Sequence, residues 1–142
     1  MAGITKMKFA LKLVRYLFAA FYVLIGIQTA LALLGIIPMP EFEMSRRNAA
    51  FQAALGETGF IVPLMALCFS AGGVLMFFDR TTPLGIVLLA PFVVVIFFTH
   101  LMLDGSIIWG SAHLALLAMF AWQFRPAIRS LWNYPVTRSH ER

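Results

Sequence analysis

Four long runs of apolar residues, each close to the length needed to cross a lipid bilayer, divide the chain. They cover Leu13 to Ile37, Gly59 to Phe78, Leu84 to Leu103 and Ile107 to Phe124, with charged or turn-forming residues between them. A bilayer core of about 30 Å requires about 20 apolar residues in a helix, because each residue advances a helix by about 1.5 Å. The pattern predicts an all-α membrane protein, a four-transmembrane-helix antiparallel bundle that forms one domain over residues 1–142.

The segment between the first two runs, Met39 to Glu57, is too polar to cross lipid and too long for a simple turn. Ser45 is a residue typical of a helix N-cap, and the residues that follow repeat at the spacing of one helical face. We expect a short interfacial helix over about residues 45–56, lying across the outer mouth of the bundle. The alternative is a disordered loop. The residues on the expected inward face are Asn48, Phe51 and Leu55.

The composition supports a membrane protein. Of the 142 residues, 61% are hydrophobic and only 12% are charged, whereas a soluble domain carries about 25% charged residues. The net charge of +5 would suggest nucleic acid in a soluble protein, but the basic residues here flank apolar runs, so we expect the lipid bilayer and no nucleic acid as a partner. The single cysteine, Cys68, excludes an internal disulfide and a cysteine-based metal cluster.

The distribution of basic residues predicts the orientation of the bundle. Four spans place both termini on one side, and nine of the eleven Lys and Arg residues then lie on that side. The positive-inside rule assigns this side to the cytoplasm, including a tail over residues 125–142, and we expect a multi-pass protein of the bacterial inner membrane. The nine residues are Lys6, Lys8, Lys12, Arg15, Arg80, Arg125, Arg129, Arg138 and Arg142.

The first apolar run has an alternative interpretation as a cleavable signal peptide. A basic stretch precedes it, and Ala30-Leu31-Ala32 resembles a cleavage motif. The run continues to Ile37 without a break, which favours an uncleaved span.

Small residues should form the contacts between spans, because lipid tails are as apolar as leucine and helices in a membrane associate by close packing. Three stripes of small residues are therefore expected to face inward. They are Gly26 and Ala30 in the first span, Ala66, Ser70, Gly72 and Gly73 in the second, and Ala112, Ala115, Ala118 and Ala121 in the fourth.

Polar side chains at membrane depth mark the candidate site, because they are costly there and usually functional. Three of them, in the outer halves of their spans, have two carboxylates at the span ends near them, and His100 and Asp104 are four residues apart on one helical face. A histidine and a carboxylate beside aromatic walls can hold a quinone carbonyl or shuttle its proton. The alternative is that the histidines are structural hydrogen-bonding groups between helices, and no histidine spacing favours a metal site. The ligand-binding candidates are His100, Asp104, His113, Gln28 and Glu57, with Phe51, Phe97, Phe98 and Trp109 as expected walls.

Several short motifs occur in an order that resembles the DoxX-like family of small four-helix integral membrane proteins. The resemblance covers about Arg15 to Leu131 and agrees with the predicted topology. The motifs are Thr58-Gly59-Phe60 with Pro63, Gly72-Gly73 before Leu75, Pro83-Leu84-Gly85, Leu89-Ala90-Pro91, His100, and Arg125 at the end of the last span.

The family resemblance implies a redox setting without naming a reaction. Members resemble the membrane subunit of an archaeal thiosulfate:quinone oxidoreductase, and others are linked to thiol or oxidative-stress systems. His100 falls on the family's third-span histidine and Gln28 on a position that is often polar, whereas Phe69 and Val95 replace an acidic residue and an asparagine common in relatives. The resemblance thus favours a quinone-linked or thiol-linked component that acts with a soluble or membrane partner subunit. The alternative is a non-enzymatic subunit that binds lipid or scaffolds a complex.

Overall fold

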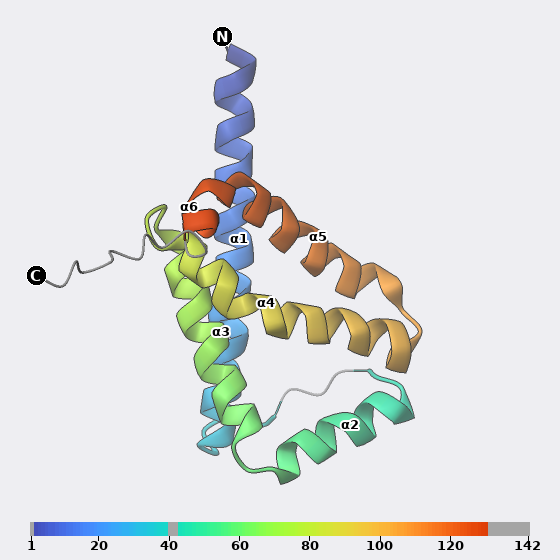
Figure 1. Ribbon diagram of the computed structural model, residues 1–142. Coiled ribbons are helices and arrows are strands. Elements are labelled where there is room, and N and C mark those ends of the chain that lie inside the picture. The colour runs from blue at the N-terminus through green and yellow to red at the C-terminus, as the bar shows by residue number, and fades with distance from the viewer. Residues whose placement is uncertain (1, 40–42, 131–142) are drawn as a thin grey trace, which may run out of the picture.

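The computed structural model describes residues 2–39 and 43–130, and this part of the chain consists of helices and short connections without any strand (Figure 1). The all-α prediction is therefore confirmed for it. Most of the predicted tail, residues 131–142, lies outside the described part. In chain order the elements are α1 (Ala2–Leu33), α2 (Arg46–Glu57), α3 (Ile61–Phe77), α4 (Thr82–Thr99), a π-helical turn η1 (His100–Asp104), α5 (Ile107–Gln123) and α6 (Arg125–Ser130).

Two stretches of helix are long and apolar enough to cross a membrane. They are Phe9–Leu33, with 25 residues, and Thr82–Asp104, with 23 residues. A third span results if α2 and α3, which meet at an angle of 96°, are counted as one bent span. Helices α3 and α5 have 17 residues each, about 25 Å of helix, so they are short for a core of about 30 Å. The length and composition of the helices thus support two to three spans, fewer than the four predicted.

Helix α1 ends four residues before the predicted Ile37. Gly35 adopts a left-handed conformation with φ +71°, and its N–H donates to Ala32 O at 3.0 Å while the N–H of Ile36 donates to Leu31 O at 3.0 Å. These two bonds form a Schellman motif, which satisfies the last carbonyl groups of a helix. A glycine therefore ends this helix before Pro38 can.

Helices α1 and α3 lie side by side and antiparallel (Figure 1), and small residues allow their close approach. A Cβ atom on Gly26 would lie 2.7 Å from Ala66 O, and one on Gly73 would lie 2.7 Å from Ala19 O. Both glycines are therefore required where two backbones meet, as the small-residue stripes of these spans predict. On the other side of α3, a Cβ atom on Gly85 of α4 would lie 2.8 Å from Gly72 O.

The predicted inward face of α5 is wrong. Ala112, Ala115 and Ala118 are exposed, and the buried residues of this helix are instead Gly110, His113, Leu117 and Phe120. Three residues turn a helix by about 300°, so each step of three falls about 60° short of a full turn. An alanine stripe at this spacing winds around the helix, whereas mixed steps of three and four keep the buried residues on one face.

A buried core joins α1, α3, α4 and α5, and a buried arginine closes it at one end. The core contains Tyr22, Phe69, Met76, Leu89 and Phe120. Arg15 of α1 is 3% exposed and donates to Asp79 in the connection between α3 and α4. Its guanidinium also lies 5.4 Å from the ring centroid of Phe124, which follows α5. One ion pair and one aromatic contact therefore tie three parts of the chain together.

Candidate functional site

Helix α2 starts as the sequence predicts, with Ser45 as its cap. The Ser45 Oγ accepts the backbone N–H of Asn48 at 3.1 Å, which satisfies one of the free donors of the first turn. Asn48 is buried, Phe51 and Leu55 are half-buried, and Arg46 and Arg47 are exposed. The helix therefore presents to the protein the face that the sequence indicates.

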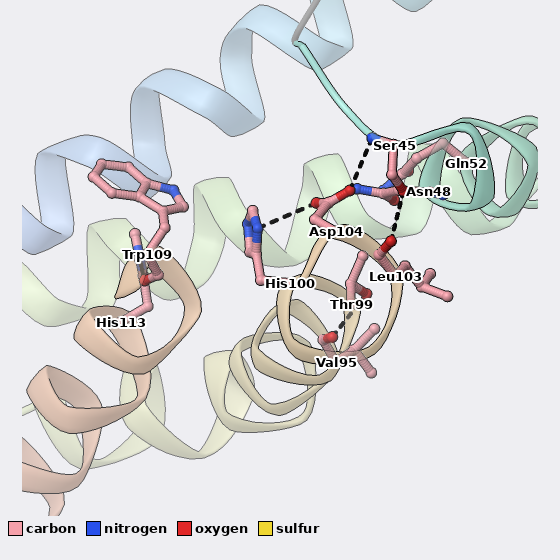
Figure 2. A network of polar contacts seen from close by, with 10 residues as sticks. All are labelled: Ser45, Asn48, Gln52, Val95, Thr99, His100, Leu103, Asp104, Trp109 and His113. Carbon is pink, nitrogen blue, oxygen red and sulfur yellow. Dashed lines mark hydrogen bonds and ion pairs between the residues drawn. The ribbon is translucent and has the colours of Figure 1, made fainter. Parts of the chain in front are cut away.

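Asp104, at the end of η1, holds the start of α2 in place (Figure 2). Its Oδ1 accepts the backbone N–H of Ser45 at 3.1 Å, and its Oδ2 accepts the Asn48 Nδ2 amide at 2.8 Å. The Ser45 hydroxyl in turn donates to Leu103 O at 2.6 Å, a carbonyl near the end of a helix, where no further turn supplies a partner. Three hydrogen bonds thus connect two segments that are more than 50 residues apart.

His100 and Asp104 form the pair that their spacing predicts. The His100 Nδ1 lies 3.3 Å from Asp104 Oδ2, and the two side chains are 26% and 12% exposed. The same carboxylate oxygen therefore faces both His100 and Asn48 (Figure 2). The carboxylate can only accept hydrogen bonds, so the proton of this contact belongs to the histidine Nδ1.

A cavity of about 310 Å³ lies beneath α2, between α3 and the second half of α4. Its walls are mostly aliphatic and aromatic, and a few polar groups, among them His100, form its edge. Phe51 contributes to the wall as predicted, and Phe92, which the sequence reasoning did not select, does so too. The lining residues are Asn48, Phe51, Gln52, Leu55, Ile61, Met65, Phe92, Val95, Ile96, Thr99 and His100.

A second, more polar cavity of about 400 Å³ lies on the other side of the histidine–carboxylate pair. Trp109 lines this cavity and not the apolar one, and Phe97 and Phe98 line neither. His100 lines both cavities, so its imidazole stands between an apolar space and a polar one. The residues of the second cavity are Glu43, Met44, Ser45, His100, Asp104, Ser106 and Trp109.

His113 does not join this pair, although it lies on the adjacent helix. It is buried, its Nδ1 donates to Trp109 O at 3.0 Å, and its ring packs on aromatic rings of α1, with a centroid distance of 5.0 Å to Phe21. Figure 2 shows it apart from the Asp104 network. His113 therefore has a structural role as a packing residue between α5 and α1, but its hydrogen bond stays within α5 and does not join two helices as the structural alternative expected.

Gln28 and Glu57 are exposed in the structure, and neither reaches His100 or Asp104. Glu57 is the last residue of α2, whereas Asp104 contacts the first turn, about 18 Å away for a helix of 12 residues. The sequence suggested that all five candidates form one cluster. The structure brings together His100 and Asp104, and it adds Ser45 and Asn48.

The residues missed by the sequence reasoning belong to α2 and to the cavity wall. Asn48 was assigned only to a helical face, and Ser45 only to a cap. Their second role depends on contacts with η1, which local spacing does not reveal.

Among the described residues, no group of three or more His, Cys, Asp or Glu side chains is placed to hold a metal ion.

Comparison with known proteins gives no match. No protein-family model, no curated protein and no solved structure matches this chain. The resemblance to the DoxX-like family therefore rests on the sequence motifs alone.

Proposed function

We propose that this chain is a DoxX-like membrane protein with four spans that binds a lipophilic ring ligand of the quinone class in the cavity under α2. In this proposal α3 and α5 also cross the membrane, and both termini are cytoplasmic. A partner subunit exchanges electrons with the bound ligand. The observation that carries the proposal is an apolar cavity with a histidine–carboxylate pair at its edge.

The size of the cavity favours a ring rather than a whole lipid. Its volume of about 310 Å³ is at the lower end of the range of about 300–1,000 Å³ for small-molecule sites. A single ring fits such a space, and a long tail would extend into the bilayer. Phe51 of α2 and Phe92 of α4 both supply aromatic surface to the cavity wall.

The His100–Asp104 pair suits a ligand whose carbonyl and hydroxyl groups interconvert. With its Nδ1 proton directed at Asp104, a neutral His100 can accept the hydroxyl of a hydroquinone at Nε2. A protonated His100 can instead donate to a quinone carbonyl, and the Asp104 carboxylate stabilises the positive charge. The pair can therefore hold the proton that accompanies reduction of such a ligand.

Thiol chemistry would also require a partner. Cys68, half-buried in α3, is the single cysteine of the chain, and thiol–disulfide exchange needs a second thiol. A thiol-linked role would thus place the exchanging cysteines on another protein and leave the quinone site here.

The ligand is tested by purifying the protein in a mild detergent and extracting it with organic solvent. We expect a quinone to be found by absorbance and mass spectrometry in near-stoichiometric amount. His100→Ala and the cavity-filling Met65→Trp should lose it, whereas the matched control His113→Ala should retain it. Equal retention by wild type and His100→Ala, or a phospholipid in place of a quinone, would contradict the proposal.

The topology is tested with a reporter enzyme that is active only outside the cytoplasm. A fusion after Arg142 should be silent, and an insertion before Ser45 should be active. The opposite pair of results would reject the orientation, and activity at both positions would reject the even number of spans.

A further inference from the structure

Helix α2 is attached to the rest of the structure at its two ends, and the cavity lies beneath its middle. At the C-terminal end, the chain turns by 96° into α3 through Gly59, which has φ +74°. At the other end, Ser45 and Asn48 are bonded to Leu103 and Asp104. These hydrogen bonds between the start of α2 and η1 are all at this second end.

The bend at Gly59 has the properties of a hinge. Its left-handed backbone is one that glycine adopts without strain, and no atom lies within 4 Å of the position where a Cβ would be. Residues 57–60 are all exposed. Rotation at this point would break no side-chain packing at the hinge itself, and the one hydrogen bond that it would have to break across Gly59 is the exposed one from the Ile61 N–H to Thr58 Oγ1, at 3.3 Å.

The middle of α2 covers the cavity without filling it. Phe51 and Leu55 are half-buried and line the space, and the opposite face, including Ala50 and Ala54, is exposed. A helix packed directly into a core would leave no such space beneath it. Little apolar contact therefore opposes the lifting of α2, and the three hydrogen bonds at its start carry much of its attachment.

We propose that α2 is a lid that opens about Gly59 to admit the ligand, and that Asp104 is the positioning residue that holds the lid closed. This inference rests on the proposed ligand site. Asp104 Oδ2 receives both the Asn48 amide and His100 Nδ1. Closing the lid and orienting the ligand-binding imidazole therefore depend on one carboxylate.

The lid is tested first without any ligand. Thr99 lines the cavity and is buried, so Thr99→Cys in a Cys68→Ser background gives a single thiol beneath α2. We expect slow reaction with a water-soluble maleimide. Asp104→Asn should accelerate labelling at least ten-fold, because an amide has one acceptor oxygen where the carboxylate has two, so it cannot accept the Ser45 N–H and also the Asn48 and His100 donors. Arg47→Ala, on the exposed face of α2, is the matched control and should leave the rate unchanged.

A reversed pair separates a lid from general loosening of the fold. Asn48→Asp combined with Asp104→Asn restores an amide–carboxylate hydrogen bond in the opposite direction, so labelling should return close to the starting rate. No acceleration in Asp104→Asn, or no rescue by the reversed pair, would overturn the lid.

The second measurement uses decylubiquinone as the probe, with tryptophan fluorescence quenching in a stopped-flow instrument. If both proposals hold, Asp104→Asn should raise the dissociation rate at least ten-fold and Arg47→Ala should not change it. Faster labelling of Thr99→Cys without any decylubiquinone binding would keep the lid and reject the quinone ligand. Binding with an unchanged dissociation rate in Asp104→Asn would keep the ligand and reject the lid.

Discussion

The ion pair between Arg15 and Asp79 should respond very unequally to the loss of its two partners. Arg15 is 3% exposed, whereas the Asp79 side chain is 66% exposed. Asp79→Asn leaves a buried guanidinium without its counter-ion, and its Nε already has no hydrogen-bond partner. Arg15→Met leaves only an exposed carboxylate, which water solvates. We therefore expect the change at the exposed residue to be the more destabilising one.

The magnitudes follow from the burial of each group. Removing one partner of a fully buried ion pair costs about 3–5 kcal/mol. Water reaches this pair on the aspartate side, so Asp79→Asn should cost about 2–3 kcal/mol. Arg15→Met loses a charge-assisted hydrogen bond of about 1.5–3 kcal/mol. Most of this lost free energy is recovered because the methionine packs against Phe124, whose ring faces the guanidinium in the wild type. The net cost of Arg15→Met should therefore be about 0–1 kcal/mol.

The free energy of unfolding can be measured by titrating SDS into mild detergent micelles and following tryptophan fluorescence. The double variant Arg15→Met with Asp79→Asn should resemble Arg15→Met alone, because no buried charge is left to need a partner. Lys12→Met is the matched control. The Lys12 Nζ also lies 3.7 Å from Asp79, but its side chain is 50% exposed, so we expect a change below about 0.5 kcal/mol.

The outcome that would refute this reasoning is a larger loss of stability in Arg15→Met than in Asp79→Asn. It would mean that the guanidinium is hydrated, or that Arg15 stabilises the fold mainly through its contacts with aromatic rings. A double variant as unstable as Asp79→Asn would reject the unpaired charge as the cause.

Three further predictions concern pH, helix packing and His113. The hydrogen bond from Arg15 lowers the pKa of Asp79 below its usual 3.8. The stability that the pair contributes should therefore be complete above about pH 5 and be lost as the pH falls through the lowered pKa. If the difference in unfolding free energy between wild type and the double variant instead grows on acidification, this prediction is wrong. Gly73→Ala should cost about 1–3 kcal/mol because its Cβ meets the α1 backbone. Gly56→Ala, in open space on α2, should be neutral or stabilising by up to about 1 kcal/mol. Equal effects of the two variants in SDS titration would reject the close approach of α1 and α3. His113→Ala should cost about 2 kcal/mol, and thermal denaturation that leaves it as stable as wild type would reject its structural role.

Local features of the chain were predictable from the sequence because they depend on neighbours within one or two turns. The apolar runs became helices, and Ser45 caps α2 as its residue type indicates. The inward face of α2 and the contact between His100 and Asp104 follow from helical spacing. Each of these depends on residues three or four positions apart, which the period of a helix brings together regardless of the rest of the fold.

Apart from the small-residue contact between α1 and α3, the contacts between helices were decided by the tertiary structure. Depth along a span placed Gln28, Glu57 and His113 near His100, but depth does not specify the direction in which a side chain points. The rotation of each helix about its axis does so, and it depends on which glycines meet which backbones, as at Gly73. The structure therefore turned Gln28 outward and His113 toward α1.

The position of α2 shows most clearly what helical spacing in the sequence does not determine. Its sequence specifies an amphipathic helix but not what lies under its apolar face. Asp104 fixes that choice by accepting hydrogen bonds from Ser45 and Asn48, which are far away in the chain. The cavity with His100 at its edge exists because this long-range contact holds α2 against α3 and α4. Such a contact depends on the path of the whole chain, so no local pattern in the sequence could predict it.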